Sequence, residues 1–107
     1  MDESTFNQMV DEVIEQLEEA IDDSLADIDY DTVGGILTLM FENESKIILN
    51  RQTPVKQIWV ATKGGGFHFD YDPDSESWLN DNDKQELFEA LSEYCTEQAG
   101  TDVNLND

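Results

Sequence analysis

The chain has 107 residues, of which 26 are Asp or Glu and 5 are Lys or Arg, so its formal net charge at pH 7 is -21. This balance argues against binding to a nucleic-acid backbone or an anionic membrane surface, because both require Lys and Arg. Metal ions and basic protein surfaces are the natural partners of such a chain, and its length predicts a single domain over residues 1–107.

Cysteine usage and hydropathy predict a compartment. The single cysteine, Cys95, excludes an intrachain disulfide and every CxxC motif, which fits a reducing environment. The N-terminus is acidic, and no apolar run has the length of a signal sequence or a membrane span. We therefore expect a cytoplasmic protein that binds neither membrane nor nucleic acid.

Residues 2–31 contain twelve carboxylates and no Lys or Arg. Apolar residues recur at helical spacing from about Ser4 to Ser24, which predicts an amphipathic helix. Its apolar face comprises Phe6, Met9, Val10, Val13, Leu17, Ala20 and Ile21, and its opposite face comprises Asp11, Glu12, Glu15, Glu18, Glu19, Asp22 and Asp23. Acids near a helix C-terminus, and like charges four residues apart, are unfavourable. The acidic face is either a solvated surface that maintains solubility or a surface for cations or a basic partner.

From Asp29 the apolar pattern changes to period two, which predicts a series of β-strands. Gly34-Gly35 predicts a tight hairpin turn, and Pro54 must interrupt the ladder because proline cannot donate to it. The expected strands are residues 29–33, 36–42, 46–52, 55–62 and 67–72 and a short strand around Trp78, with a turn at 64–66.

A second helix is expected from Asp83, because Asp83 and Glu86 resemble a capping box, and Gly100 should end it. Its apolar stripe is Leu87, Phe88, Leu91, Tyr94, Cys95 and Ala99, and we expect Val103 and Leu105 to pack against the helices. The order helix, antiparallel meander, helix predicts an α+β fold. It is a two-layer αβ-sandwich with two helices on one face of a five- to six-stranded sheet.

Alternation in the segment QIWVA places Ile58 and Val60 on one side of its strand and Gln57, Trp59 and Ala61 on the other. If the aliphatic side chains pack under the helices, Trp59 faces solvent beside Asn50 and Gln52 of the preceding strand. An exposed tryptophan among amides is typical of a protein interface. The alternative is an aromatic ring that lies flat on a neighbouring strand.

Catalytic patterns are lacking. The sequence contains no Ser-His-Asp grouping, phosphate loop or HExxH motif, and exposed acids on a convex helix have no reason for a raised pKa, so we expect no enzyme activity. His68, the one histidine, is predicted to be an exposed strand residue, although a patch with Asp70 and Asp72 is conceivable. Trp78 and Cys95 are predicted to belong to the core.

Residues 50–69, NRQTPVKQIWVATKGGGFHF, resemble the signature of the frataxin family in its bacterial branch, and GGILTLMFEN and the acidic helix before it match as well. The resemblance implies an αβ-sandwich in the cytosol that binds ferrous and ferric iron weakly. It implies a role in iron–sulfur cluster assembly, as iron donor, regulator or both, in contact with a cysteine desulfurase and the cluster scaffold protein. We expect the chain to be a monomer.

The resemblance also assigns residues. The family's acidic ridge falls on Asp11, Glu12, Glu15, Glu18, Glu19, Asp22, Asp23, Asp27, Asp29 and Asp31, and its partner surface falls on Asn50, Gln52, Gln57 and Trp59. Bacterial relatives can carry a histidine where this chain has Asn7, so any metal site near Glu3 and Asn7 would have oxygen ligands only.

Carboxylates three or four residues apart on a helix can share one ion, but water must supply the remaining ligands. Such sites are weak and would also accept Mn, Co, Ca or lanthanide ions. Two other classes of function fit the same ridge. One is an iron oxidase that detoxifies iron, and the other is an acidic mimic that blocks a basic nucleic-acid-binding protein.

Overall fold

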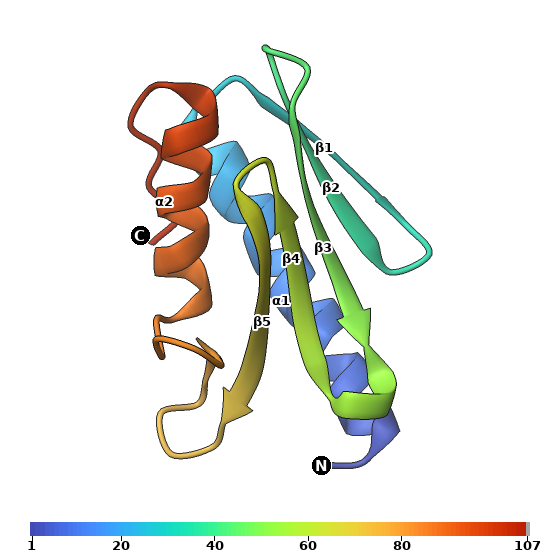
Figure 1. Ribbon diagram of the computed structural model, residues 1–107. Helices are drawn as coiled ribbons and strands as arrows, with labels where there is room; N and C mark the ends of the chain where they lie inside the picture. The colour runs from blue at the N-terminus through green and yellow to red at the C-terminus, as the bar shows by residue number, and fades with distance from the viewer. Residues whose placement is uncertain (107) are drawn as a thin grey trace.

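The computed structural model describes residues 1–106, over which the chain forms two α-helices, six β-strands and one 3-10 turn (Figure 1). The elements are α1 (Glu3–Ser24), β1 (Ile28–Val33), β2 (Ile36–Phe41), β3 (Lys46–Gln52), the 3-10 turn η1 (Thr53–Val55), β4 (Gln57–Thr62), β5 (Gly65–Asp72), β6 (Ser77–Asn80) and α2 (Leu87–Ala99). The strands pair antiparallel in sequence order from β1 to β6.

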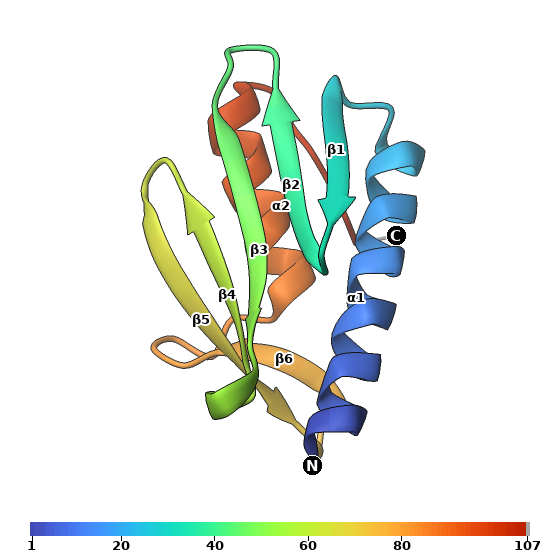
Figure 2. The same cartoon turned by 90° about the vertical axis from the view of Figure 1, so that its right-hand side faces the viewer.

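Both helices lie against the same face of the sheet, α1 beside the β1 edge and α2 behind the middle strands (Figure 2). The predicted αβ-sandwich is confirmed. Within residues 1–106, neither helix has the length and hydropathy needed to cross a membrane.

Helix α1 begins and ends where its sequence provides caps. The Asp2 carboxylate accepts a hydrogen bond of 2.8 Å from the Thr5 amide, and this bond lowers the pKa of Asp2. Leu25 ends the helix in the left-handed conformation, with φ 59°. The buried face of α1 is Phe6, Val10, Val13, Ile14, Leu17 and Ile21. Met9 and Ala20, expected on this face, are only partly buried at its margins.

The core lies between the helices and the inward residues of the sheet. Phe6 of α1 packs edge to face against Trp78 of β6, with ring centroids 5.9 Å apart. This contact joins the first helix to the last strand. Trp78 and Cys95 are buried, as predicted, and Val103 and Leu105 of the C-terminal tail are buried as well.

Two strand boundaries differ from the prediction by two residues, and the start of β1 and the end of β2 differ by one. Strand β4 begins at Gln57 rather than at residue 55, because Thr53–Val55 coil into η1 and Lys56 follows in the left-handed conformation at φ 54°. Strand β5 begins at Gly65, since Thr62 already pairs with Gly65 and only residues 63–64 form the turn. The second and third glycines of this run therefore belong to the ladder.

Helix α2 begins at Leu87, not at Asp83. The Glu86 carboxylate is the N-cap and accepts hydrogen bonds from the amides of Phe88 and Glu89. The Asp83 carboxylate instead accepts from the Gln85 amide at 3.0 Å within the preceding turn. An Asp side chain that closes its own local turn competes with helix formation, which explains the later start. Gly100 ends the helix at φ 76°, as predicted.

Replacing Gly35 with alanine should destabilise the fold more than replacing Gly34. Both glycines have positive φ, 61° at Gly34 and 78° at Gly35, so both variants carry backbone strain of about 1–2 kcal/mol. A Cβ at Gly35 would also lie 3.0 Å from Nη2 of Arg51, whereas one at Gly34 would meet nothing within 4 Å. Denaturant midpoints of Gly35→Ala and Gly34→Ala measure the difference, and equal midpoints would show that Arg51 does not pack tightly against this turn.

Cys95 should make the fold less stable at high pH. Burial raises the pKa of its thiol from the usual 9.0 to about 12. The unfolded thiol therefore loses its proton at lower pH than the folded one. This contribution to stability is constant below pH 9.0 and falls as the pH rises toward about 12. Urea unfolding between pH 8 and 11 of the parent and of Cys95→Ala measures it, and parallel pH profiles would contradict the assignment.

Candidate metal and partner-binding surfaces

The ten predicted metal-binding carboxylates line α1 and the start of the sheet, and we call them the acidic ridge. All of them are exposed except Glu18, which is half-buried, and the last turn of α1 contains no basic residue. The members are Asp11, Glu12, Glu15, Glu18, Glu19, Asp22, Asp23, Asp27, Asp29 and Asp31.

Two ridge carboxylates bind side chains of the edge strand. Thr32 donates a hydrogen bond of 2.6 Å to Oε2 of Glu18, and the Tyr30 hydroxyl donates one of 2.9 Å to Oδ2 of Asp22. The bond to Asp22 raises the pKa of Tyr30, with smaller contributions from desolvation and from the charges of Asp22 and Glu18. These bonds hold β1 against α1, a role for Tyr30 and Thr32 that the sequence analysis missed.

The strand carboxylates of the ridge face the other way. Because Tyr30 and Thr32 point toward α1, the alternating residues Asp29 and Asp31 point to the open face of the sheet. The ridge is therefore divided between the outer side of α1 and the opposite side of β1. Across residues 1–106, no three His, Cys, Asp or Glu side chains converge in an arrangement that could hold one ion.

The spacing of the ridge carboxylates on α1 determines how they can bind cations. On the outer side of α1, carboxylates four residues apart, such as Glu15 and Glu19 or Glu19 and Asp23, are close enough to share a cation. Two carboxylates fill only part of the coordination sphere of a hard cation, and water must supply the rest. Binding at such a pair would be shallow and poorly selective.

One member of the ridge has a positive partner, which the sequence analysis did not predict. Nη2 of Arg51, on β3, lies 2.7 Å from Oδ1 of Asp11. Nη1 of Arg51 donates to the Asn7 side-chain oxygen at 3.2 Å. The acidic face has no Lys or Arg within its own segment, yet at Asp11 it has a cationic partner from β3. The Asn7 oxygen, near which a metal site would have oxygen ligands only, is engaged by the same Arg51.

The predicted partner residues Asn50, Gln52, Gln57 and Trp59 lie together on the open face, and we call them the tryptophan surface. Asn50 pairs with Trp59 and Gln52 pairs with Gln57 across β3 and β4. Ile58 and Val60 of β4 point into the core, whereas Trp59 points to the opposite side of the strand and is 37% exposed. The side chains of QIWVA therefore alternate between the core and the open face as predicted.

Trp59 is both exposed and stacked. Its indole lies on the imidazole of His68 in β5, with ring centroids 4.4 Å apart and an interplanar angle of 18°. Its Nε1 donates a hydrogen bond of 2.8 Å to Gln57, whose amide donates one of 3.0 Å to Asp70. The two alternatives from the sequence are therefore not exclusive, because the ring lies flat on its neighbour and still presents one face to solvent.

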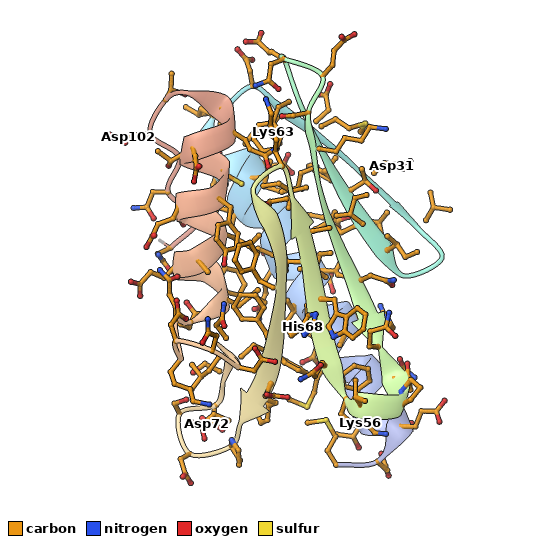
Figure 3. All side chains as sticks on the ribbon, viewed as in Figure 1. Asp31, Lys56, Lys63, His68, Asp72 and Asp102 are labelled. Atoms are coloured by element: carbon orange, nitrogen blue, oxygen red, sulfur yellow. The ribbon has the colours of Figure 1, made fainter. Side chains whose placement is uncertain are left out.

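His68 does not form a patch with Asp70 and Asp72. Its Nδ1 lies 3.7 Å from Oδ2 of Asp81, in the loop after β6. Asp72 lies at the far end of β5, well separated from His68 (Figure 3). The Ser75 hydroxyl donates a hydrogen bond of 2.7 Å to Asp72, and this bond, together with backbone donors, lowers the pKa of Asp72.

The sequence is similar to a known protein family and to named bacterial proteins. A family model described as the frataxin-like domain matches residues 1–101. The iron-sulfur cluster assembly protein CyaY of Pseudomonas aeruginosa is 48% identical over 98% of this chain and 97% of its own. The protein of the same name from Vibrio atlanticus is 45% identical over 97% of this chain and 98% of its own.

Two solved structures are similar to the chain. Frataxin from Psychromonas ingrahamii superposes with a TM-score of 0.91 at 39% identity and covers 100% of both chains. Trimeric frataxin from the yeast Saccharomyces cerevisiae, complexed with ferrous iron, has a TM-score of 0.68 at 24% identity. It covers 94% of this chain and 88% of its own. The yeast structure shares the fold alone.

Proposed function

The chain belongs to the frataxin family, and we propose that it is a non-catalytic iron-binding protein that acts in iron–sulfur cluster assembly as iron donor, regulator or both. The names of its bacterial relatives support the pathway. The metal is argued from the exposed carboxylates of this chain itself. The observation that carries the proposal is the acidic ridge, a row of exposed carboxylates on a chain of net charge -21.

Iron would bind at carboxylate pairs on the outer side of α1. Ferrous iron accepts carboxylate and water ligands, which are what this surface offers. The same pairs would take manganese, cobalt, calcium or lanthanide ions with little discrimination. Weak exposed sites suit a protein that senses iron or hands it over, because a stored ion would need more ligands than two side chains provide.

The two surfaces fit two partners. The acidic ridge would meet a basic surface of the cysteine desulfurase, where opposite charges speed association. The tryptophan surface, with an aromatic ring among amides, would contact the scaffold protein on which the cluster forms. The part of the ridge on α1 and the tryptophan surface lie on different sides of the sandwich. A cytoplasmic monomer could therefore contact both partners at once.

An iron oxidase would require a site that binds two iron oxidation states differently and gives oxygen access to a fixed ion. The ridge offers exposed carboxylates on a convex helix, which supports a binding role over a catalytic one. Ferrous oxidation in air, measured with the protein and with an equal concentration of free acetate, separates the two functions. A faster rate with the protein would overturn the non-catalytic proposal.

The proposed iron site is tested by neutralising three carboxylates with Glu15→Gln, Glu19→Gln and Asp23→Asn combined. None of the three accepts a hydrogen bond from another side chain in the part of the chain that the structure describes. The matched control combines Glu89→Gln, Glu97→Gln and Asp102→Asn on and beyond α2, which changes the net charge equally. We expect the ridge variant to lose about tenfold or more in affinity for ferrous iron and for the desulfurase, since each carboxylate contributes Coulomb attraction to a cation. The control should stay within about twofold. Equal losses in both variants would show that net charge, not the ridge, binds iron.

A further inference from the structure

Arg51 joins three elements that are distant in the sequence. Its Nη2 contacts Oδ1 of Asp11 at 2.7 Å and the carbonyl oxygen of Gly35 at 3.2 Å. Its Nη1 contacts the side-chain and carbonyl oxygens of Asn7 at 3.2 and 3.3 Å. The guanidinium thus links β3 to α1 and to the β1–β2 turn through four acceptor contacts.

This arrangement is built into the fold. The Arg51 side chain is only 16% exposed, and its buried Nε has no hydrogen-bond partner within residues 1–106. Gly35 makes room for the guanidinium, because a Cβ there would lie 3.0 Å from Nη2. An arginine held on three sides has few alternative rotamers, so its charge stays beside Asp11.

The ion pair is also exceptional in this chain. Among residues 1–106, Arg51–Asp11 is the one salt bridge formed by a Lys or Arg, and the four lysines form none. Asp11 is the first carboxylate of the ridge, one helical turn before Glu15. Without Arg51, Asp11 and Glu15 would be the first pair able to share a cation.

We propose that Arg51 closes the N-terminal end of the acidic ridge at Asp11 to cations, so that metal binding on α1 is confined to the ridge carboxylates after Asp11. This inference rests on the proposed iron-binding function and specifies where on the ridge it operates. A metal ion at Asp11 would have to displace the guanidinium or approach it closely. Arg51 is thus a residue that determines the position of bound metal, and it touches no metal itself.

The experiment uses Mn²⁺ as a paramagnetic probe and measures the broadening of backbone amide signals along α1. At Mn²⁺ concentrations well below that of the protein, broadening in the parent should be greatest from Glu15 to Asp23 and should decline through Asp11 to Asn7, because Asp11 lies one helical turn beyond the nearest ligand. In Arg51→Met, which keeps most of the side-chain volume without the charge, the affinity of the Asp11 region for Mn²⁺ should rise about tenfold or more. Arg51→Lys keeps the charge and should retain much of the parent pattern.

Two controls separate this effect from a change in net charge or in structure. Lys46→Met removes one positive charge from the same strand at a position that forms no salt bridge with residues 1–106, and should leave the parent pattern unchanged. Adding Asp11→Asn to Arg51→Met should abolish the new broadening. Dispersed amide spectra of every variant establish that the fold is retained.

The outcomes are distinguishable. Strong broadening at Asp11 in the parent, equal to that at Glu19, would overturn the role of Arg51 and leave the iron-binding ridge standing. The same applies if Arg51→Met does not change the pattern. An absence of broadening anywhere on α1 would overturn the proposed function itself.

Discussion

Replacing Trp59 with alanine should leave the fold nearly intact and weaken binding to the proposed scaffold partner by about 30-fold or more, the loss typical of an interface hot spot. Trp59 projects from the open face, 37% exposed, and its hydrogen bond to Gln57 lies at the surface. Removing the indole therefore opens no cavity in the core. It does remove the aromatic surface that a partner would cover.

The second tryptophan supplies the matched control. Trp78 is 4% exposed and packs edge to face with Phe6 and Tyr71, so Trp78→Ala should cost about 3–5 kcal/mol of unfolding free energy. Urea unfolding of both variants, combined with calorimetric titration of the scaffold protein, gives the comparison. A Trp59→Ala variant that loses stability as Trp78→Ala does would make Trp59 a core residue. A stable variant with unchanged affinity would remove it from the interface.

The orientation of Trp59 could be predicted because it depends on a local rule. Successive strand residues face opposite sides, so Ile58 and Val60 in the core require Trp59 outside. The stacking on His68 could not be predicted in the same way. It depends on the register between β4 and β5, and this register is fixed by a two-residue turn that the run of three glycines does not specify.

The acidic face of α1 was likewise predictable from the helical period, and the ion pair that it forms with Arg51 was not. Arg51 and Asp11 are 40 residues apart in sequence, and only the packing of β3 against α1 brings them together. The division of the ridge at β1 has a simpler origin. Asp29 and Asp31 alternate with Tyr30 and Thr32, so the strand rule already requires the two pairs to face opposite sides.

Buried polar residues were the other features that the pattern could not reveal. Gln98 is a polar residue on the same side of α2 as the apolar stripe, and its side chain is buried at 9% exposure. Its side chain accepts from the Lys63 amide at 2.8 Å and donates to Ser45 at 3.0 Å, so it joins two hairpins to the helix. A buried polar group is tolerable only with such partners, and the partners come from distant turns.

Salt and divalent cations should both raise the melting temperature of this protein. Screening shortens the range of repulsion between exposed carboxylates from about 30 Å at 0.01 M to about 3 Å at 1 M ionic strength. A cation at ten times its Kd adds about 1.4 kcal/mol per site if it binds only the folded state, and each kcal/mol corresponds to about 4 °C or more in a domain of this size. Calorimetry in sodium chloride and in millimolar Mn²⁺ measures both effects.

Two pairs of ridge residues test whether the repulsion is located on α1. Glu19→Gln with Asp23→Asn removes two charges near the helix C-terminus that have no side-chain hydrogen-bond partner among the described residues. This variant should raise the melting temperature at low salt by roughly a few degrees. Glu18→Gln with Asp22→Asn removes equal charge but weakens the bonds from Thr32 and Tyr30, so its gain should be smaller. If salt, Mn²⁺ and both variants all leave the melting temperature unchanged, repulsion between the ridge carboxylates does not destabilise the fold. Cations would then have no strain to relieve when they bind.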